Sequence, residues 1–389
     1  MCLYDLLSRI SSGKSPKIIK SPQRGVDVLL TGTFHSDNWI RPHLEPMAAS
    51  KYCRRVRMVA SDKMPLIDKV EAIYAPAFLT QILGKVPARL FIFAWVALKD
   101  RPDILGGFSM IPNGLIAALC ARRISAKSMY ICGGGPREVA GYLANPIFGL
   151  SGKHDKMIEN YLHNALGRFD LIITMGTSAV KYFSQYADAA YHIMPGGYST
   201  KTFYPTEDRP EYDLILIGRL TYIKRVDIFL ESVRLAKERI PDISAIVVGG
   251  GPDLDMLRQK ATDLEISRNV KFLGHQENVE NWLRKSKVFV LTSDSEGLSQ
   301  ALIQAFLCGL PAVVSNVGDL GDLVHDGVNG FLVNGQKAEA YSDKYIEILS
   351  NEGCLNRLKR EAFTSGEKFR MENVIRDWDS IFERVNSVS

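Results

Sequence analysis

The chain has 389 residues, of which 46% are hydrophobic and 23% charged; this composition excludes a disordered protein and suits two domains with separate cores. Charge is uneven: residues 1–205 hold 25 Lys and Arg against 14 Asp and Glu, a net of +11, whereas the whole chain carries +5. The basic half either meets an anionic lipid surface or a phosphate-bearing acceptor, or is an ordinary solvated surface.

Along the first half, short apolar runs alternate with amphipathic stretches, which predicts an α/β fold with a parallel sheet. Strands are expected at 26–30, 57–59, 104–105, 128–132, 171–174 and 192–194. Helical patterns lie between them, for instance at 115–121 and 157–166. Gly, Pro and charged residues then cluster at 196–210, which predicts a linker. We therefore expect a first domain over residues 1–200.

The alternation restarts after the linker and predicts a second α/β domain over residues 206–367. Strands are expected at 214–217, 245–248, 271–273, 288–291 and 312–315. At 226–236 apolar side chains recur with the spacing of one helix face. The same spacing recurs at 375–385. The apolar face of this last helix must pack against another element.

Two cations leave the first strand of the second domain. The chain turns at Gly218 and places Arg219 and Lys224 ahead of the next helix. A guanidinium can bridge two phosphate oxygens, and an ammonium adds a point charge. As a departing diphosphate gains charge, such groups stabilise the transition state more than the ground state. The alternative is a pair of solvated loop cations.

Residues 294–333 are the most informative segment. Glu296 is followed by Gly297 and by a helix start at 298–300. A glycine-containing loop that feeds a helix start offers free backbone N–H groups and the positive end of a dipole, so it can seat phosphate. The adjacent carboxylate can accept hydrogen bonds from sugar hydroxyls. One segment therefore holds both ends of a nucleotide-sugar.

Other features of the second domain are less specific. The glycines of 247–252 either permit a tight strand-to-helix turn or contact a ligand, and they lack the G-x-G-x-x-G spacing of a nicotinamide site. Asp253 and Asp255 resemble a metal-holding pair, yet acidic residues are also expected at a helix start, so no metal is predicted. The loop from Leu273 to Gln276 is the candidate base pocket, and nothing there separates uridine from guanosine.

In the first domain, glycine turns follow two of the expected strands. Gly32 lies in the first turn and 132–136 form the second. Each of these turns either brings its backbone close to the donor or acceptor, or only connects a strand to the next element. His35 is the best-placed titratable group of this half, as a ligand contact or as an ordinary solvent-facing histidine. The apolar run 90–96 contacts a membrane or forms a core helix.

The motifs of 213–333 resemble, in order, those of the GT-B sugar transferases of glycosyltransferase family 4, also called group 1. They are G-R-L-x(3)-K, V-x-G-x-G-P, S-x-x-E-G, a helix ending C-G-L-P, and D-G-x-N-G-F-L-V. The resemblance implies two Rossmann-like domains facing a central cleft, with 368–389 packing back on the first domain. It also implies an NDP-sugar donor held by the second domain, no metal or other cofactor, and retention of anomeric configuration.

Carried over by position, Arg219 and Lys224 would bind the diphosphate and Glu296 the donor-sugar hydroxyls. Backbone N–H groups would hold the sugar and phosphate at Leu298, Ser299 and Gln300.

Two departures stand out. The family's second glutamate is replaced by Gln304, whose amide lacks the charge of a carboxylate, so we expect weaker donor binding. The histidine that many members carry after a first-domain strand is missing at 130–133, so its role is absent or taken by His35.

We therefore predict a retaining transferase that moves a hexose-type sugar from an NDP-sugar to a saccharide or lipid-linked acceptor, in cell-envelope polysaccharide synthesis. No apolar run reaches the roughly 18–20 residues of a spanning helix, residues 1–24 lack a signal-peptide pattern, and the six cysteines have no paired spacing. A cytoplasmic enzyme is expected, with an anionic membrane surface as a further partner and no nucleic acid. The alternatives are a non-catalytic sugar-nucleotide-binding partner subunit and an epimerase or phosphorylase on the same fold.

Overall fold

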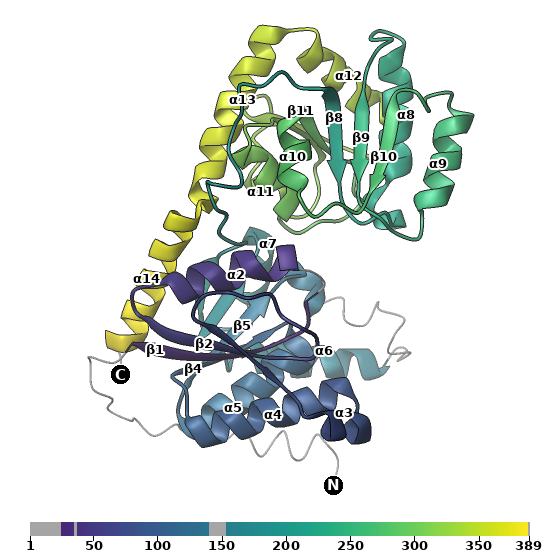
Figure 1. Ribbon diagram of the computed structural model, residues 1–389. Helices are drawn as coiled ribbons and strands as arrows, with labels where there is room; N and C mark the ends of the chain where they lie inside the picture. Colours follow the sequence, from purple (N-terminus) through teal and green to yellow (C-terminus); the bar gives the residue numbers. More distant parts are fainter. Residues whose placement is uncertain (1–24, 35–36, 140–152, 388–389) are drawn as a thin grey trace. The chain divides into compact units, whose positions relative to one another are not determined.

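The computed structural model describes residues 25–34, 37–139 and 153–387 (Figure 1). The chain divides into two compact units. Unit 1 runs to Gly197 and takes up the chain again from Val374, whereas unit 2 is Tyr198–Asn373. Each unit is built on its own parallel sheet.

The sheet of unit 1 has seven parallel strands in the order β3-β2-β1-β4-β5-β6-β7. They are β1 (Val26–Thr31), β2 (Cys53–Ala60), β3 (Val70–Tyr74), β4 (Ile104–Phe108), β5 (Lys127–Cys132), β6 (Leu171–Thr174) and β7 (Ala190–Ile193). The central strands β1 and β4 are buried along their whole length, as expected for a parallel sheet covered on both faces.

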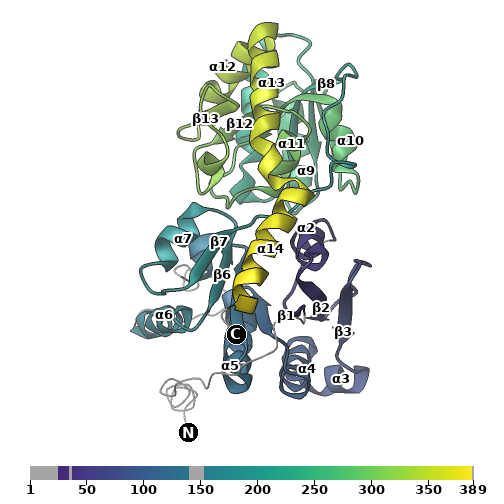
Figure 2. The same cartoon turned by 90° about the vertical axis from the view of Figure 1, so that its left-hand side faces the viewer.

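Helices cover both faces of this sheet. They are α2 (Asp37–Ala49), α3 (Ala77–Leu83), α4 (Lys85–Asp100), α5 (Leu115–Ile124), α6 (Lys153–Leu166), α7 (Thr177–Phe183) and the end of α14 (Met371–Ser387). Figures 1 and 2 show α3, α4 and α5 side by side on one face, with α2 on the other. No helix among the described residues has the length and apolar content to cross a bilayer.

The last helix packs on unit 1, as the resemblance implied. Trp378 and Phe382 on its inner face are buried. Its polar flank is tied to the end of α2, because Ser50 Oγ donates to Asp379 Oδ1 at 2.6 Å. The return of the chain to its first unit is therefore fixed by both apolar burial and a hydrogen bond.

Unit 2 has six parallel strands in the order β10-β9-β8-β11-β12-β13. They are β8 (Tyr212–Ile217), β9 (Ala245–Val248), β10 (Val270–Gly274), β11 (Ser286–Leu291), β12 (Ala312–Ser315) and β13 (Gly330–Val333). The helices are α8 (Val226–Lys237), α9 (Leu254–Asp263), α10 (Val279–Arg284), α11 (Gln300–Leu307), α12 (Ala338–Leu349) and α13 (Glu352–Gly366).

Both sheets therefore have the doubly wound Rossmann order, and the α/β class is confirmed. In each unit the strand order reverses beside the first strand, between β1 and β4 in unit 1 and between β8 and β11 in unit 2. Ligands of open parallel sheets bind at this switch point, outside the carboxyl ends of the strands. The loops that follow these four strands are where a functional site is expected.

Candidate functional site

The switch point of unit 2 brings the two main predicted motifs together. β8 and β11 are parallel neighbours, so the loops that follow them leave the same edge of the sheet. The loops are also tied to each other: Asp294 N donates to Ile223 O at 2.8 Å, and Thr292 Oγ1 donates to the carbonyl of Arg225 at 2.8 Å. The cation turn and the acidic loop, about 70 residues apart in the chain, thus form one site.

At the centre of this site Lys224 and Glu296 form an ion pair. Lys224 Nζ lies 2.5 Å from Glu296 Oε1, and the two side chains are only 23% and 10% exposed. Ser293 Oγ donates to the same carboxylate oxygen at 2.7 Å. Ser293 is the first residue of the S-x-x-E-G motif, but the motif assigned no role to it, and Thr292 was not singled out. Both are fully buried polar residues directly after β11, and a signal of that kind is visible only once the strand end is known.

Arg219 lies on the same turn but is exposed, and it makes no hydrogen bond or ion pair with any residue the structure describes. Gly218 precedes it and packs on the stem of Lys224, since a Cβ at Gly218 would lie 3.6 Å from Lys224 Cε. The site therefore offers one cation already neutralised by a carboxylate and one that remains open to a ligand.

Two glycines support these loops from behind. Gly249, at the end of β9, has φ +137°, and a Cβ there would come within 1.9 Å of Gly218 O. Gly318, after β12, has φ +57°, and its Cβ would come within 1.7 Å of Glu296 O. Close backbone approach thus accounts for Gly249, one of the glycines of 247–252, because a side chain would displace the turn that carries Arg219.

The start of α11 leaves backbone donors open, as predicted. Ser299 is the N-cap residue but its side chain makes no capping hydrogen bond, and the N–H groups of Leu298 and Ser299 donate to no acceptor among the described residues. Gln300 begins the helix and Gln304 follows one turn later, with only 7% of its surface exposed. Gly297 joins these donors to Glu296.

Leu273 lies farther from this site than the other predicted residues of unit 2. It is near the end of β10, which β9 separates from β8. Its carbonyl accepts a hydrogen bond from Gln276 Nε2 at 2.9 Å, and Gln276 Oε1 in turn accepts one from Trp282 Nε1 at 3.2 Å. No contact among the described residues joins Leu273 to the Lys224–Glu296 pair.

In unit 1, Gly32 has a packing role at the switch point. A Cβ at Gly32 would lie 2.7 Å from the Cβ of Phe108. The Gly32 carbonyl accepts a hydrogen bond at 2.8 Å from the guanidinium of Arg89, which also donates to Asn113 Oδ1 at 2.7 Å. Arg89 is 1% exposed and ties the loops after β1 and β4 together. His35 lies outside the described residues.

The second glycine turn of unit 1, after β5, is held by a carboxylate that sequence reasoning missed. Glu138 accepts hydrogen bonds from Gly134 N at 2.5 Å, Tyr130 Oη at 2.8 Å and Met110 N at 3.2 Å. Burial raises the pKa of Glu138. Internal turn chemistry thus satisfies donors of this loop that could otherwise face a ligand.

The acidic pair at the start of α9, Asp253 and Asp255, lies at the protein surface. Asp255 is 95% exposed and lies 3.6 Å from Arg258, one turn along the same helix. Within the described ranges, no three His, Cys, Asp or Glu residues gather in a way that could hold a metal ion.

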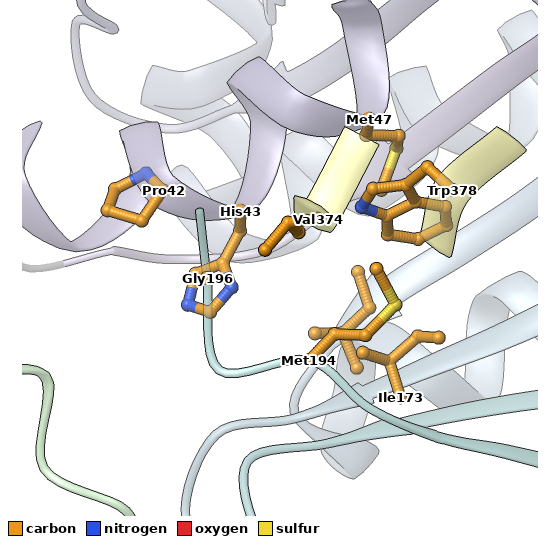
Figure 3. Close-up of a pocket in the computed structure, with 9 residues that line it drawn as sticks. Pro42, His43, Met47, Ile173, Met194, Gly196, Val374 and Trp378 are labelled. Atoms are coloured by element: carbon orange, nitrogen blue, oxygen red, sulfur yellow. The ribbon is translucent and has the colours of Figure 1, made fainter. Parts of the chain in front are cut away.

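A small pocket in unit 1 lies where α14 meets α2 (Figure 3). Met194 and Trp378 contribute apolar walls, and His43 from α2 supplies its main polar group. Because the ring is held out of water, the pKa of His43 is lowered to about 4. An uncharged histidine in an apolar lining packs the final helix, and we interpret the pocket as part of the core.

Comparison with known proteins places unit 2 in a family. Residues 201–365 match the model of the family described as glycosyl transferases group 1. The resemblance to group 1 is confirmed over this part of the chain.

Two curated relatives illustrate the match. One is a poly(glycerol-phosphate) alpha-glucosyltransferase of Bacillus subtilis (strain 168), 23% identical over 58% of this chain. The other is the UDP-Gal:alpha-D-GlcNAc-diphosphoundecaprenol alpha-1,3-galactosyltransferase of Escherichia coli, 30% identical over 39% of this chain. The chain spans only 36% and 41% of their respective lengths.

A solved structure extends the likeness to both units. HepE of Anabaena, in complex with UDP and glucose, superposes with a TM-score of 0.72 at 17% identity, covering 92% of this chain and 99% of HepE. At this identity the likeness shows the fold alone. With two Rossmann-type sheets and a returning last helix, the fold class is GT-B.

Proposed function

We propose that the protein is a retaining glycosyltransferase that moves a hexose-type sugar from an NDP-sugar to a saccharide or lipid-linked acceptor. The observation that carries the proposal is the meeting of a cation turn, a carboxylate and open backbone donors at the switch point of a group 1 domain. These are complementary to a diphosphate and a sugar, the two ends of such a donor.

In this proposal Arg219 and Lys224 bind the diphosphate. The transfer breaks the bond between the anomeric carbon and the phosphate oxygen, so negative charge grows on the leaving diphosphate. An open guanidinium and an ammonium at that position stabilise the transition state more than the bound donor. These two side chains are the groups of this chain that supply positive charge to the reaction.

Glu296 accepts hydrogen bonds from hydroxyls of the donor sugar. Its carboxylate is already oriented by Ser293, so little freedom is lost when the sugar binds. The N–H groups of Leu298, Ser299 and Gln300 hold sugar and phosphate oxygens at the positive end of α11. Gln304 faces the ribose with an amide in place of a carboxylate.

Retention follows from attack on the same face that the leaving group departs from. The acceptor hydroxyl oxygen bonds to the anomeric carbon, and its proton passes to the departing phosphate oxygen. This step balances without a side-chain nucleophile, and we assign none.

The acceptor belongs with unit 1, and its class is proposed from the names of the relatives. One relative is named for poly(glycerol-phosphate) and another for a sugar linked to diphosphoundecaprenol, that is, for a phosphate polymer and a lipid-linked saccharide. We extend this class to the present chain, together with a cytoplasmic location at a membrane surface.

A thermal-shift screen of nucleoside diphosphates and their sugars tests the donor. Binding to the folded protein raises its melting temperature by mass action, so a response to one nucleotide alone identifies the base. Transfer of labelled sugar to lipid-linked acceptors then tests the reaction. No response to any sugar nucleotide would contradict the proposal.

A second candidate function is a sugar-nucleotide-binding subunit without catalysis. Gln304 in place of a glutamate and the 130–133 segment without a histidine favour it. The two functions separate in one pair of measurements: calorimetric binding of the donor with no consumption across many acceptors supports the subunit, whereas donor consumption supports the enzyme.

A further inference from the structure

Helix α3 is an apolar helix that the described part of the chain leaves largely uncovered. Its sequence is Ala-Phe-Leu-Thr-Gln-Ile-Leu, and none of its seven residues is buried. Phe78, Ile82 and Leu83 are between 44% and 74% exposed. Exposed apolar surface of this kind does not stabilise the fold, and it is typical of a surface that contacts another molecule.

The adjacent helix α4 continues this surface. Phe93, Val96 and Ala97 are buried in the core, but Phe91, Trp95 and Leu98 are 49–56% exposed. The exposed three are spaced four and three residues apart, so they share one face of the helix. The core-helix interpretation of 90–96 therefore holds for one face of α4, and the opposite face is exposed.

The surroundings of this face are basic. Residues 72–99 and 104–137 contain Lys and Arg but no Asp or Glu. Lys85 and Lys99 are exposed at the two ends of α4. Lys85 Nζ lies 3.1 Å from Asp62 Oδ1, whereas Lys99 Nζ lies 4.8 Å from the ring centroid of Trp95. Arg123 is exposed on α5, which lies beside α4 (Figure 1).

We propose that the α3–α4 face docks on the surface of an anionic lipid bilayer. The α3–α4 face comprises the exposed apolar side chains Phe78, Ile82, Leu83, Phe91, Trp95 and Leu98. Aromatic and aliphatic side chains enter the boundary between headgroups and acyl chains, while flanking Lys and Arg meet anionic headgroups. The exposed side chains of α3 and α4, with Lys99 at the end of α4, match this arrangement.

Charge favours the bilayer over a second copy of the chain. In a two-fold dimer the same face meets itself, so Lys99 and Arg123 would approach their own copies, while the nearby carboxylates Asp62 and Asp100 are already paired with Lys85 and Arg57. An anionic membrane supplies the missing negative charge.

The proposed docking on a bilayer does not depend on the proposed sugar transfer. Vesicle binding can therefore fail while donor binding stands, and the reverse. If both hold, docking brings unit 1 to the surface where a lipid-linked acceptor resides.

The test is sedimentation of the full chain with vesicles of phosphatidylcholine alone or with phosphatidylglycerol. We expect binding to the anionic vesicles, weakened about tenfold by raising salt to the molar range. The double variant F91S/W95S should lose binding by at least about tenfold because its apolar contact area is reduced. Met256→Ser, which removes an exposed apolar side chain from α9 of unit 2, is the matched control and should bind as wild type.

Trp95 reports the contact directly, because the other three tryptophans are half-buried or buried. Its fluorescence should be open to acrylamide in solution and quenched by brominated acyl chains on vesicles, and Trp95→Phe should remove both signals. Three outcomes would overturn the proposal: no vesicle binding, equal binding by F91S/W95S, or a dimer that this variant dissolves. Protection of Trp95 from acrylamide without vesicles would also overturn it, since another part of the chain would then cover the face.

Discussion

Acidification should destabilise unit 1 through His43. The buried ring has a pKa of about 4 in the folded protein, against 6.5 for an ordinary histidine. As pH falls, His43 is therefore protonated below about pH 6.5 in the unfolded chain but only below about pH 4 in the folded protein. Stability is fully present above the upper value and is lost as pH falls through this window. The loss between pH 7 and pH 5 amounts to about 2 kcal/mol, at about 1.4 kcal/mol per pKa unit.

Denaturant unfolding at the two pH values, followed by tryptophan fluorescence, measures this loss. His43→Leu fills a similar apolar space and cannot titrate, so its free energy of unfolding should fall by about 2 kcal/mol less than that of wild type. The difference between the two proteins removes contributions from other groups. A ring that titrates near pH 6.5 in NMR spectra of the folded protein, or equal pH dependence in both proteins, would refute the reasoning.

Three further predictions concern the site of unit 2. Arg219→Ala should lower kcat/KM by the equivalent of about 2–4 kcal/mol. The control is Arg268→Ala, which removes an exposed arginine just before the amino end of β10, whereas the site lies at the carboxyl ends of the strands; this variant should leave turnover unchanged. Gly249→Ala should cost about 1–3 kcal/mol of stability and reduce the donor-induced thermal shift, because the added Cβ collides with Gly218 O. Gln304→Glu should lower the melting temperature without donor, since it buries a charge, and enlarge the shift produced by donor; a smaller shift would argue against the ribose contact.

The sequence predicted most of the sheet because parallel strands are buried on both faces and read as continuous apolar runs. All eleven expected strands lie on or overlap observed ones. β3 was missed although Ala72, Ile73 and Tyr74 form a short apolar run; it is an edge strand that contains Glu71, and none of its residues is buried. β13 was missed because its Gly-Phe-Leu-Val was read only as the end of a motif. An edge position does not by itself remove the signal, because the edge strand β7 was predicted although none of its residues is buried.

The site was predictable as parts but not as a geometry. Chemistry alone singled out Lys224 and Glu296, yet only the strand order reveals that β8 and β11 are neighbours. Sequence spacing likewise could not show that Gly249 lies against the backbone of Gly218, or that Glu138 accepts a hydrogen bond from Gly134 N. Both contacts join residues that meet only after folding. Arg89 was not singled out from the sequence, although it joins two loops of the unit 1 switch point.

The Lys224–Glu296 pair has a consequence for how the proposed donor and its spent nucleotide are told apart. A ligand that offers only phosphate draws Lys224 away and leaves Glu296 without its cation, at an energetic cost to the protein. A complete sugar nucleotide compensates both groups at once, phosphate for the ammonium and hydroxyls for the carboxylate. Once the sugar has left, Glu296 pairs with Lys224 again. The re-formed ion pair competes with the diphosphate for Lys224 and so favours its release.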